Sequence, residues 1–225
     1  MKEKFIVILV NLTIAITGLL VIAGCHKEKF DLTDIEGNGY HIVTIGTQVW
    51  TVENLRTTHY NNREAIPIVK DSAQWINLST GACCFYSNNS GYKNYGCLYN
   101  WYAINDSRQL APIGWHIATD ADWQTLIDYL GGQNVAGGKL KVTGTGLWLA
   151  PNAGATNETG FSAIPAGCRN NSGSFLYLKN YSFWWSSTPN TSNEAFNRLI
   201  SSDAAQIVRG NYDKKNGFTV KCVKD

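Results

Sequence analysis

Hydrophobic residues follow two patterns along this chain. One long apolar run extends from Phe5 to Ile22, and beyond it apolar residues occur in short runs separated by Gly, Asn, Ser and Thr. A long apolar run is typical of a segment that enters the export machinery or a membrane. The short runs predict one globular domain of small strands and helices joined by many turns.

The residues around the long run predict a secretory signal. Lys2 and Lys4 precede the run, and Ala23-Gly24-Cys25 follow it directly, which gives a positive start, an apolar middle and small residues at the cut site. The last four residues, Ile22 to Cys25, resemble the lipobox of bacterial lipoproteins, which implies acylation of Cys25. The alternative is an uncleaved membrane anchor, because the run is just long enough to span a bilayer.

The signal divides the chain into a signal peptide (1–24), a lipidated cysteine with a charged tether (25–33) and a domain (34–225). Two or three acyl chains, such as palmitate, hold a soluble domain at a bilayer without any other membrane element. We therefore expect the lipid bilayer as a partner, bound through acylated Cys25. The expected location is the bacterial cell envelope, at the outer membrane, either periplasmic or surface-exposed.

The first half of the domain predicts a hairpin and short helices. Residues 40–45 and 48–55 read as two strands joined by a Gly-Thr turn, and Asp71 or Ser72 can cap a short helix through Leu78. The spacing of Leu98, Trp101 and Tyr102 predicts a helix over residues 97–104. A further helix begins at a capping box of residues 119–122, carries one apolar face and ends at Gly131-Gly132.

The second half of the domain predicts strands separated by Asn- and Ser-rich turns. Candidate strands are residues 161–164, 174–178, 183–187, 197–201, 205–209 and 217–223. Because the strands do not alternate with helices, the pattern predicts an α+β fold. In such a fold the helices pack on small twisted antiparallel sheets, with long loops in the second half.

Composition and charge narrow the function. The chain has 11 Tyr, 8 Trp and 21 Gly, only 16% charged residues and a formal net charge of +2. Near-neutrality without basic clusters argues against nucleic acid as a partner. No Cys-x-x-Cys pair is present and the four histidines are widely spaced, so the sequence predicts no metal and no other cofactor.

Five cysteines remain after Cys25 is set aside, and an oxidising compartment permits disulfides among them. An odd number leaves at least one thiol unpaired. Cys83 and Cys84 are adjacent, and the strained geometry of a vicinal disulfide disfavours their pairing with each other. The remaining three are Cys97, Cys168 and Cys222.

Six ordered sequence blocks resemble the Fibrobacter succinogenes major paralogous domain over residues 34–225. The blocks are Asp34 to Tyr40, Ile45 to Leu55, Tyr95 to Ala103, Gly114 to His116, Trp184 to Thr188 and Gly217 to Val223. The resemblance implies a C-type lectin-like fold with two short helices, close to the domain of the formylglycine-generating enzyme. Residues 115–123 are similar to the start of the helix Arg-Leu-Pro-Thr-Glu-Ala-Glu-Trp in that enzyme.

The chain departs from the family pattern at its cysteines. The usual cysteine before the Pro-x-Gly-Trp turn is replaced by Ala111, whereas Cys97 and Cys168 stand where the family more often has arginine and an aromatic residue. If the missing cysteine normally pairs with Cys222, the resemblance implies that Cys97 or Cys168 replaces it. The disulfide candidates are therefore Cys97, Cys168 and Cys222.

No sequence motif supports catalysis. The formylglycine-generating enzyme uses a copper-binding cysteine pair a few residues apart, and the second half of this chain has only Cys168 and Cys222. The Pro-Asn dipeptides at 151–152 and 189–190 lack the acidic or amide partner of calcium-dependent lectins and read as turns. The candidate acids, bases or ligands have simpler structural roles, and we predict no catalytic residue among Glu53, His116, Asp120, Asp122 and Glu158.

Aromatic and amide residues supply the predicted binding site. The tryptophans of the shared blocks read as core, namely Trp50, Trp101, Trp115, Trp123, Trp184 and Trp185. Loop residues of the second half are the better contact candidates, and they are Asn170, Asn171, Tyr177, Tyr181, Asn190, Asn193, Asn211 and Tyr212.

The sequence as a whole predicts a non-catalytic lectin-like binding or adhesion module with a glycan or protein ligand. The segment Asn190 to Tyr212 is expected to be the counterpart of the loop that presents the binding face in lectin-like folds. Two alternatives stay open: an oxidoreductase of the formylglycine-generating type, and a structural envelope component.

Overall fold

The computed structural model describes residues 29–225. The predicted signal peptide, Cys25 and residues 26–28 of the tether lie outside the described residues. Within residues 29–225, no helix is long and apolar enough to cross a membrane. The described part is an α+β domain with short helices and small antiparallel sheets, as the pattern predicts.

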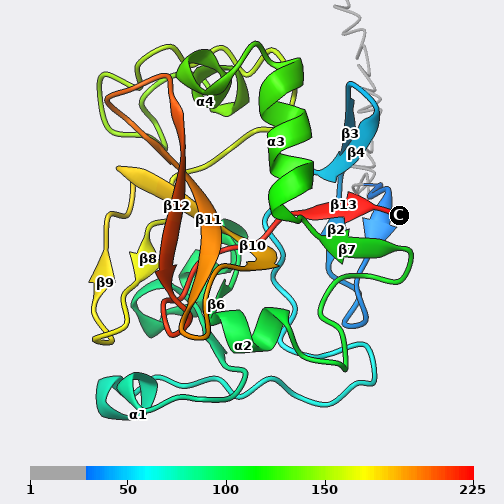
Figure 1. Cartoon of the computed structure of the whole chain (residues 1–225), viewed down its shortest axis with the longest axis vertical. Helices are drawn as coiled ribbons and strands as arrows, with labels where there is room; N and C mark the ends of the chain where they lie inside the picture. The colour runs from blue at the N-terminus through cyan, green and yellow to red at the C-terminus, as the bar shows by residue number, and fades with distance from the viewer. Residues whose placement is uncertain (1–28) are drawn as a thin grey trace, which may run out of the picture.

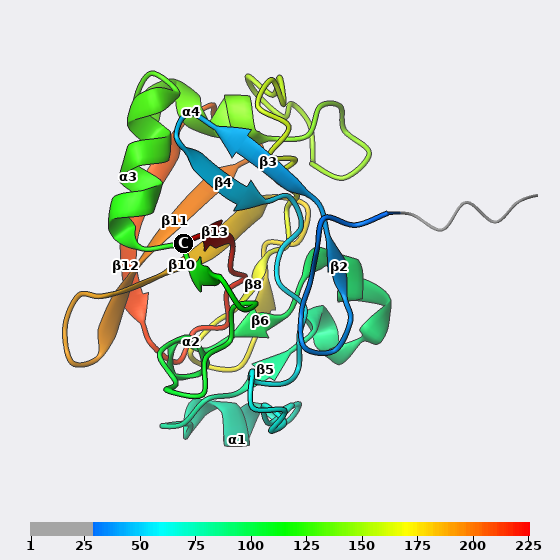
Figure 2. The same ribbon diagram turned by 90° about the vertical axis from the view of Figure 1, so that its right-hand side faces the viewer.

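Two larger sheets organise the domain (Figures 1 and 2). One is a meander of β10 (Tyr181–Pro189), β11 (Glu194–Ser201) and β12 (Ile207–Asp213). The other has the order β3-β4-β13-β7 and consists of Ile42–Ile45, Gln48–Thr51, Cys222–Lys224 and Trp115–Ile117. The meander lies in the middle of Figure 1, between this second sheet and the small hairpin of β8 and β9.

Three two-stranded ladders and four α-helices complete the fold. The ladders are β1–β2 (Leu32–Thr33, Gly39–Tyr40), β5–β6 (Cys83–Cys84, Leu98–Tyr99) and β8–β9 (Cys168–Arg169, Phe175–Leu176). The helices are α1 (Ser72–Ile76), α2 (Trp101–Ile104), α3 (Asp120–Tyr129) and α4 (Gln133–Leu140). Two 3₁₀ turns, Tyr86–Asn88 and Ser90–Tyr95, connect β5 to β6.

Local signals located several elements correctly. The hairpin β3–β4 and the helix after Asp71 are confirmed, with the Asp71 carboxylate accepting from Gln74 N. The capping box is confirmed in full, because Thr119 Oγ1 accepts from Asp122 N and the Asp122 carboxylate accepts from Thr119 N. Such a box satisfies donors that the first turn of a helix leaves unpaired.

Two predicted elements need correction, and one helix is additional. Residues 97–104 are not one helix, since Leu98 and Tyr99 form β6 and Asn100 caps the short helix α2. Residues 161–164 do not form the predicted strand; Ala163 forms one isolated β-bridge, with Lys141. Helix α4 was not predicted, and the described domain has four α-helices instead of two.

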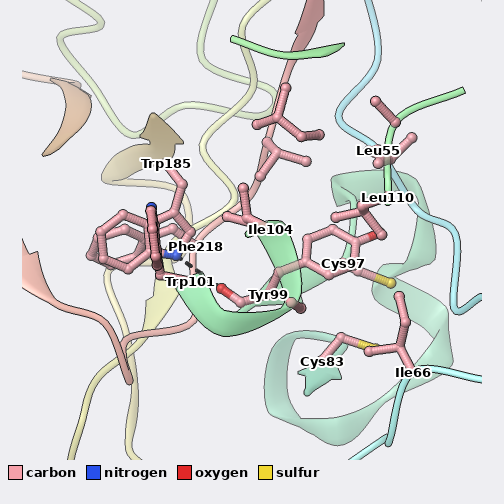
Figure 3. Close-up of a cluster of buried hydrophobic side chains, with 14 of the residues drawn as sticks. Leu55, Ile66, Cys83, Cys97, Tyr99, Trp101, Ile104, Leu110, Trp185 and Phe218 are labelled. Atoms are coloured by element: carbon pink, nitrogen blue, oxygen red, sulfur yellow. Dashed lines mark hydrogen bonds between the residues drawn. The ribbon is translucent and has the colours of Figure 1, made fainter. Parts of the chain in front are cut away.

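Tryptophan and phenylalanine fill two adjoining cores. In the first, Trp101 and Trp185 pack around Phe218 and Tyr99 (Figure 3). In the second, the rings of Trp50, Trp123, Phe161 and Trp184 contact one another with centroids 4.9 to 6.1 Å apart. Five of the six tryptophans predicted as core are buried, whereas Trp115 is only half-buried.

Buried cations hold the long loops in place. Side chains that donate to backbone carbonyls from buried positions are Lys141, Arg169, Lys214 and Lys221. Each also lies over an aromatic ring, at 4.3 to 5.5 Å from the ring centroid. A buried charge is stable only when such partners replace water.

Candidate functional site

A groove of about 350 Å³ lies where the β8–β9 hairpin meets one end of the meander. Its walls come from segments far apart in sequence, at residues 168–177, 183, 194 and 211–218. Main-chain bridges join these segments, between Gly167 and Ser182 and between Arg169 and Gly217. The volume is in the usual range for small-molecule sites, about 300–1,000 Å³. We call this feature the tyrosine groove.

The floor of the tyrosine groove is formed by aromatic rings. Phe183 and Phe218 are buried, and their rings stack at 5.0 Å. Tyr212 meets both rings edge-on, at 6.2 and 5.4 Å. Offset and edge-to-face pairs of this kind are favourable beyond the area that they bury, so the floor is rigid as well as apolar.

Two tyrosines form an exposed apolar rim above this floor. Tyr177 is 50% exposed and Tyr212 is 37% exposed. Tyr177 lies at the turn after β9 with a left-handed backbone (φ +64°), and its carbonyl accepts hydrogen bonds from Asn180 N and Tyr181 N. A left-handed conformation costs an L-residue about 1 kcal/mol or more, so this turn holds Tyr177 in place at an energetic cost.

Polar groups on the rim keep unused hydrogen-bonding capacity. Asn211 Nδ2 donates to Glu194 Oε2 at 2.7 Å, and the Asn171 main chain donates to Asn216 Oδ1 at 3.1 Å. Within residues 29–225 no hydrogen bond is recorded for the Asn171 side chain or for the Tyr177 and Tyr212 hydroxyls. These donors and acceptors face solvent and are free to bind a ligand.

The charges that line the tyrosine groove are all negative. They are the carboxylates of Glu194 and Asp213, which stand directly opposite each other on β11 and β12. Like charges opposite each other in a ladder are unfavourable. The nearby cations Arg169 and Lys214 are buried and donate to main-chain carbonyls instead. Burial, followed by the neighbouring Cys168 thiol and tyrosines, raises the pKa of Tyr212, so its hydroxyl stays protonated at neutral pH.

The structure brings together five of the eight predicted contact residues. Those that line the tyrosine groove are Asn170, Asn171, Tyr177, Asn211 and Tyr212. Tyr181 lies beside Tyr177, with ring centroids 5.1 Å apart. Asn190 and Asn193 are exposed in the turn between β10 and β11 and do not line the groove.

Sequence reasoning missed the carboxylates and the floor. Glu194 and Asp213 become neighbours only through the β11–β12 register, which no local pattern fixes. Phe183 and Phe218 read as ordinary core residues, because their spacing does not reveal that one edge of that core is open. Only knowledge of the β11–β12 register would have predicted that Glu194 and Asp213 are neighbours.

A second cavity of about 310 Å³ lies beside His116, between α2 and β7. His116 Nδ1 lies 2.8 Å from Asp225 Oδ1, and Nε2 lies 3.0 Å from Asp122 Oδ2. Both ring nitrogens are therefore engaged in structural contacts. His116 is therefore not available as a free acid or base in the wall of this cavity.

The other candidate acids and bases also have structural partners. Glu53 accepts from the main chain of His41 at 2.7 Å, and Asp120 binds Arg198 and Arg209 at 2.6 and 2.9 Å. Glu158 forms an exposed pair with Lys139 at 3.1 Å. In the part of the chain that the structure describes, no group of three or more His, Cys, Asp or Glu side chains could hold a metal ion.

The cysteines differ from the expected pairing. Cys83, Cys84, Cys97, Cys168 and Cys222 are all buried free thiols in the structure. Cys97 lies against Cys83, on a different element from Cys222, which pairs with Ile117 in the β13–β7 ladder. The sequence alone could not show this, because Cys83 and Cys97 meet only through the β5–β6 ladder.

The fold and the groove define a small α+β domain with an aromatic, acidic surface depression. Its family is shown by sequence: the model of the Fibrobacter succinogenes major domain matches residues 43–224, and the chain belongs to that family. No curated protein matches the chain. No solved structure matches it either.

Proposed function

We propose that this chain is an envelope lipoprotein whose domain binds a glycan in the tyrosine groove. The observation that carries the proposal is the meeting of two exposed tyrosines with amide and carboxylate groups over an aromatic floor. The ring of a sugar has an apolar face that packs on tyrosine, and its hydroxyls bond to amides and carboxylates. The groove offers both kinds of contact within one small volume.

The charge of the groove narrows the class of glycan. Glu194 and Asp213 accept hydrogen bonds from sugar hydroxyls or from an amino group, but they repel a carboxylate or a sulfate. Among residues 29–225, no cationic side chain lines the groove to compensate that repulsion. The preferred ligand is therefore a neutral or amino sugar, and acidic sugars are disfavoured.

We also propose the lectin-like fold and the lipid anchor. In support of the fold, the last strand β13 pairs with the early strand β4, and the connections between the helices and the meander are long and irregular. The anchor rests on the sequence around Cys25. Replacing Cys25 by serine should move the protein from the detergent phase to the aqueous phase in a detergent partition of cell lysate.

A glycan array with the purified full chain tests the binding proposal. Tyr177→Ala and Tyr212→Ala should each weaken binding about tenfold or more, because each removes a stacking face. Tyr129→Ala is the matched control, since Tyr129 is 66% exposed on α3 and does not line the groove. An array that stays silent with folded wild-type protein contradicts the proposal.

The oxidoreductase alternative makes a different prediction at Cys168, a thiol on the groove wall. Burial raises the pKa of Cys168 to about 12, so this thiol is protonated at neutral pH and is a poor nucleophile and metal ligand. Copper titration with a cysteine-peptide oxidation assay separates the two functions. Peptide oxidation that is lost in Cys168→Ser would favour the enzyme.

A further inference from the structure

Cys83 and Cys97 lie on the same face of the β5–β6 ladder. The antiparallel register places Cys83 opposite Tyr99 and Cys84 opposite Leu98. Because side chains alternate along a strand, Cys83, Tyr99 and Cys97 share one face, and Cys84 and Leu98 share the other. The two faces bury their residues in different clusters, the first around Tyr99 and Trp101 and the second around Trp75.

The two thiols lie in the same part of the core. Cys83 and Cys97 are both 0% exposed and belong to one buried cluster, and the Cys97 thiol donates to Arg56 O at 3.5 Å. Figure 3 shows both sulfur atoms pointing into the same space beside Ile66. The neighbouring Cys97 thiol, followed by burial, raises the pKa of Cys83 well above its usual value.

We propose that Cys83 and Cys97 form the disulfide of this domain when it folds under oxidising conditions. Each thiol loses its proton and a sulfur–sulfur bond forms between them. The two electrons and two protons pass to a disulfide oxidant, either a protein thiol–disulfide oxidoreductase or a small disulfide such as oxidised glutathione, whose own S–S bond is reduced to two thiols. The step is an exchange through a mixed disulfide, which requires no metal.

The surroundings of the other cysteines single out this pair. Cys84 points to the opposite face, where it packs in the cluster of Trp75 and Leu98. Burial raises the pKa values of Cys168 and Cys222. Cys222 lies on β13, and Cys168 lies on β8. Cys83 and Cys97 are the two thiols whose sulfur atoms point into one space in Figure 3.

The cross-link would close the segment that contains both 3₁₀ turns. Tyr86 in that segment packs against Tyr92 at 5.5 Å and against Phe175 of β9 at 5.4 Å. The next residues of β9 and its turn, Leu176 and Tyr177, line the tyrosine groove. A closed segment restricts the unfolded chain, so the disulfide stabilises the domain whether or not the groove binds a glycan.

Peptide mapping of the full chain under non-reducing conditions tests the proposal. The protein is refolded with a glutathione redox buffer, free thiols are blocked with N-ethylmaleimide, and the digest is analysed by mass spectrometry. We expect one cross-link, between the peptide of Cys83 and that of Cys97, with Cys168 and Cys222 alkylated only after denaturation. Alkylation of both Cys83 and Cys97, or a cross-link that includes Cys222, would overturn the proposal.

Two matched variants separate the neighbouring cysteines, which lie on one peptide. The cross-link should be lost in Cys83→Ser and kept in Cys84→Ser. Dithiothreitol should lower the Tm of wild type and of Cys84→Ser by several degrees and leave the Tm of Cys83→Ser unchanged. A Tm of wild type that does not respond to dithiothreitol contradicts the proposal even if a variant fails to fold. Because the readouts are a mass and a Tm, they are independent of glycan binding.

Discussion

At the residue scale, Lys141 is a buried side chain that organises a loop instead of serving a ligand. Its Nζ donates to the carbonyls of Ala153, Ser201 and Ala204, each at 2.8 Å. Burial lowers the pKa of Lys141 to about 8, which is the expected cost of holding an ammonium away from water. Ala153 and Ala204 lie in loops and Ser201 is the last residue of β11, so this one donor ties two loops to the end of the meander.

Replacing Lys141 by methionine should destabilise the domain by about 2–4 kcal/mol, because the substitution removes the donor of three buried carbonyls while keeping the aliphatic stem. Urea unfolding measures the change. Lys139→Met is the matched control: Lys139 forms an exposed pair with Glu158, and loss of that pair should cost about 0.5 kcal/mol. Equal effects in the two variants would contradict the role given to Lys141.

His116 should make stability depend on pH. Burial of the ring opposes its charge, but the hydrogen bonds with Asp225 and Asp122 outweigh that effect and raise the pKa of His116. A raised folded pKa stabilises the protein fully below the unfolded value, about 6.5, and the contribution is lost as pH rises through the folded value. Burial opposes the charge of Asp122, but hydrogen bonds from Thr119 and His116 outweigh it and lower the pKa of Asp122. The pairing with His116 therefore weakens at acid pH, where Asp122 becomes protonated.

The measurement is the Tm difference between wild type and His116→Gln across pH 4.5 to 9. We expect the largest difference near pH 5 to 6 and a decline toward pH 8 and above. The comparison with wild type matters because Lys141 and Lys221, with lowered pKa values, act in the opposite sense over the same alkaline range. A Tm difference that does not change with pH would contradict a stabilising role for the charged pairs of His116 with Asp122 and Asp225.

The candidate contact residues show what residue-level reasoning can and cannot find. Exposed aromatic and amide residues in Asn-rich turns are recognisable by type, and Tyr177, Asn211 and Tyr212 do line the tyrosine groove. Asn190 and Asn193 have the same character but lie in another turn. Residue type predicts exposure, whereas the tertiary structure decides which exposed residues lie together in one groove.

At the scale of elements, helix α4 depends on two glycines that the sequence presents as helix breakers. A Cβ on Gly137 would lie 2.4 Å from Gln206 O, and one on Gly138 would lie 2.4 Å from Gly154 O. The helix therefore packs against main chain at a distance that only glycine permits. The glycines weakened the helical pattern, which is why the sequence did not predict α4.

Gly138→Ala should destabilise the domain by about 1–3 kcal/mol, although alanine is the better helix former, because the new methyl group meets a backbone carbonyl. Thermal unfolding followed by circular dichroism measures the effect. Gly146→Ala is the control, since no atom lies within 4 Å of its Cβ position, and a change within about 0.5 kcal/mol is expected. A stabilised Gly138→Ala would mean that α4 is displaced from Gly154.

The segment from Cys97 to Ile104 shows how pairing overrides periodicity. Its apolar spacing suits a helix, yet Leu98 and Tyr99 pair with β5, and Tyr99 also bridges to Phe218. Asn100 then caps α2 by accepting from Ala103 N at 3.1 Å. Long-range partners decide between two local patterns that the same residues allow.

At the scale of the whole molecule, the short strand β13 joins the first and last parts of the domain. Val223 pairs with Trp50 of β4 on one side and with His116 of β7 on the other. It is 3% exposed. The four-stranded sheet therefore closes only when the final residues add to the middle of it.

Val223→Asp should abolish cooperative unfolding, because an unpaired carboxylate in this position costs several kcal/mol, comparable with the stability of a small domain. Lys224→Asp, one residue later and exposed, should retain a sharp transition. The two proteins can be compared by thermal melts followed in the near ultraviolet. A cooperative melt of Val223→Asp close to that of wild type would show that β13 is dispensable.

The sequence by itself determined the features that depend on neighbouring residues. These are the capped helix α3, the hairpin β3–β4, the tryptophan-rich core, the α+β class and the family; the signal and Cys25 remain predictions of the same local kind. Only the tertiary structure decided β6, α4, the contact of Cys83 with Cys97 and the acidic pair of Glu194 and Asp213 in the tyrosine groove. Caps and turns are fixed by interactions over a few positions, whereas strand register and close packing depend on partners that can lie more than a hundred residues away.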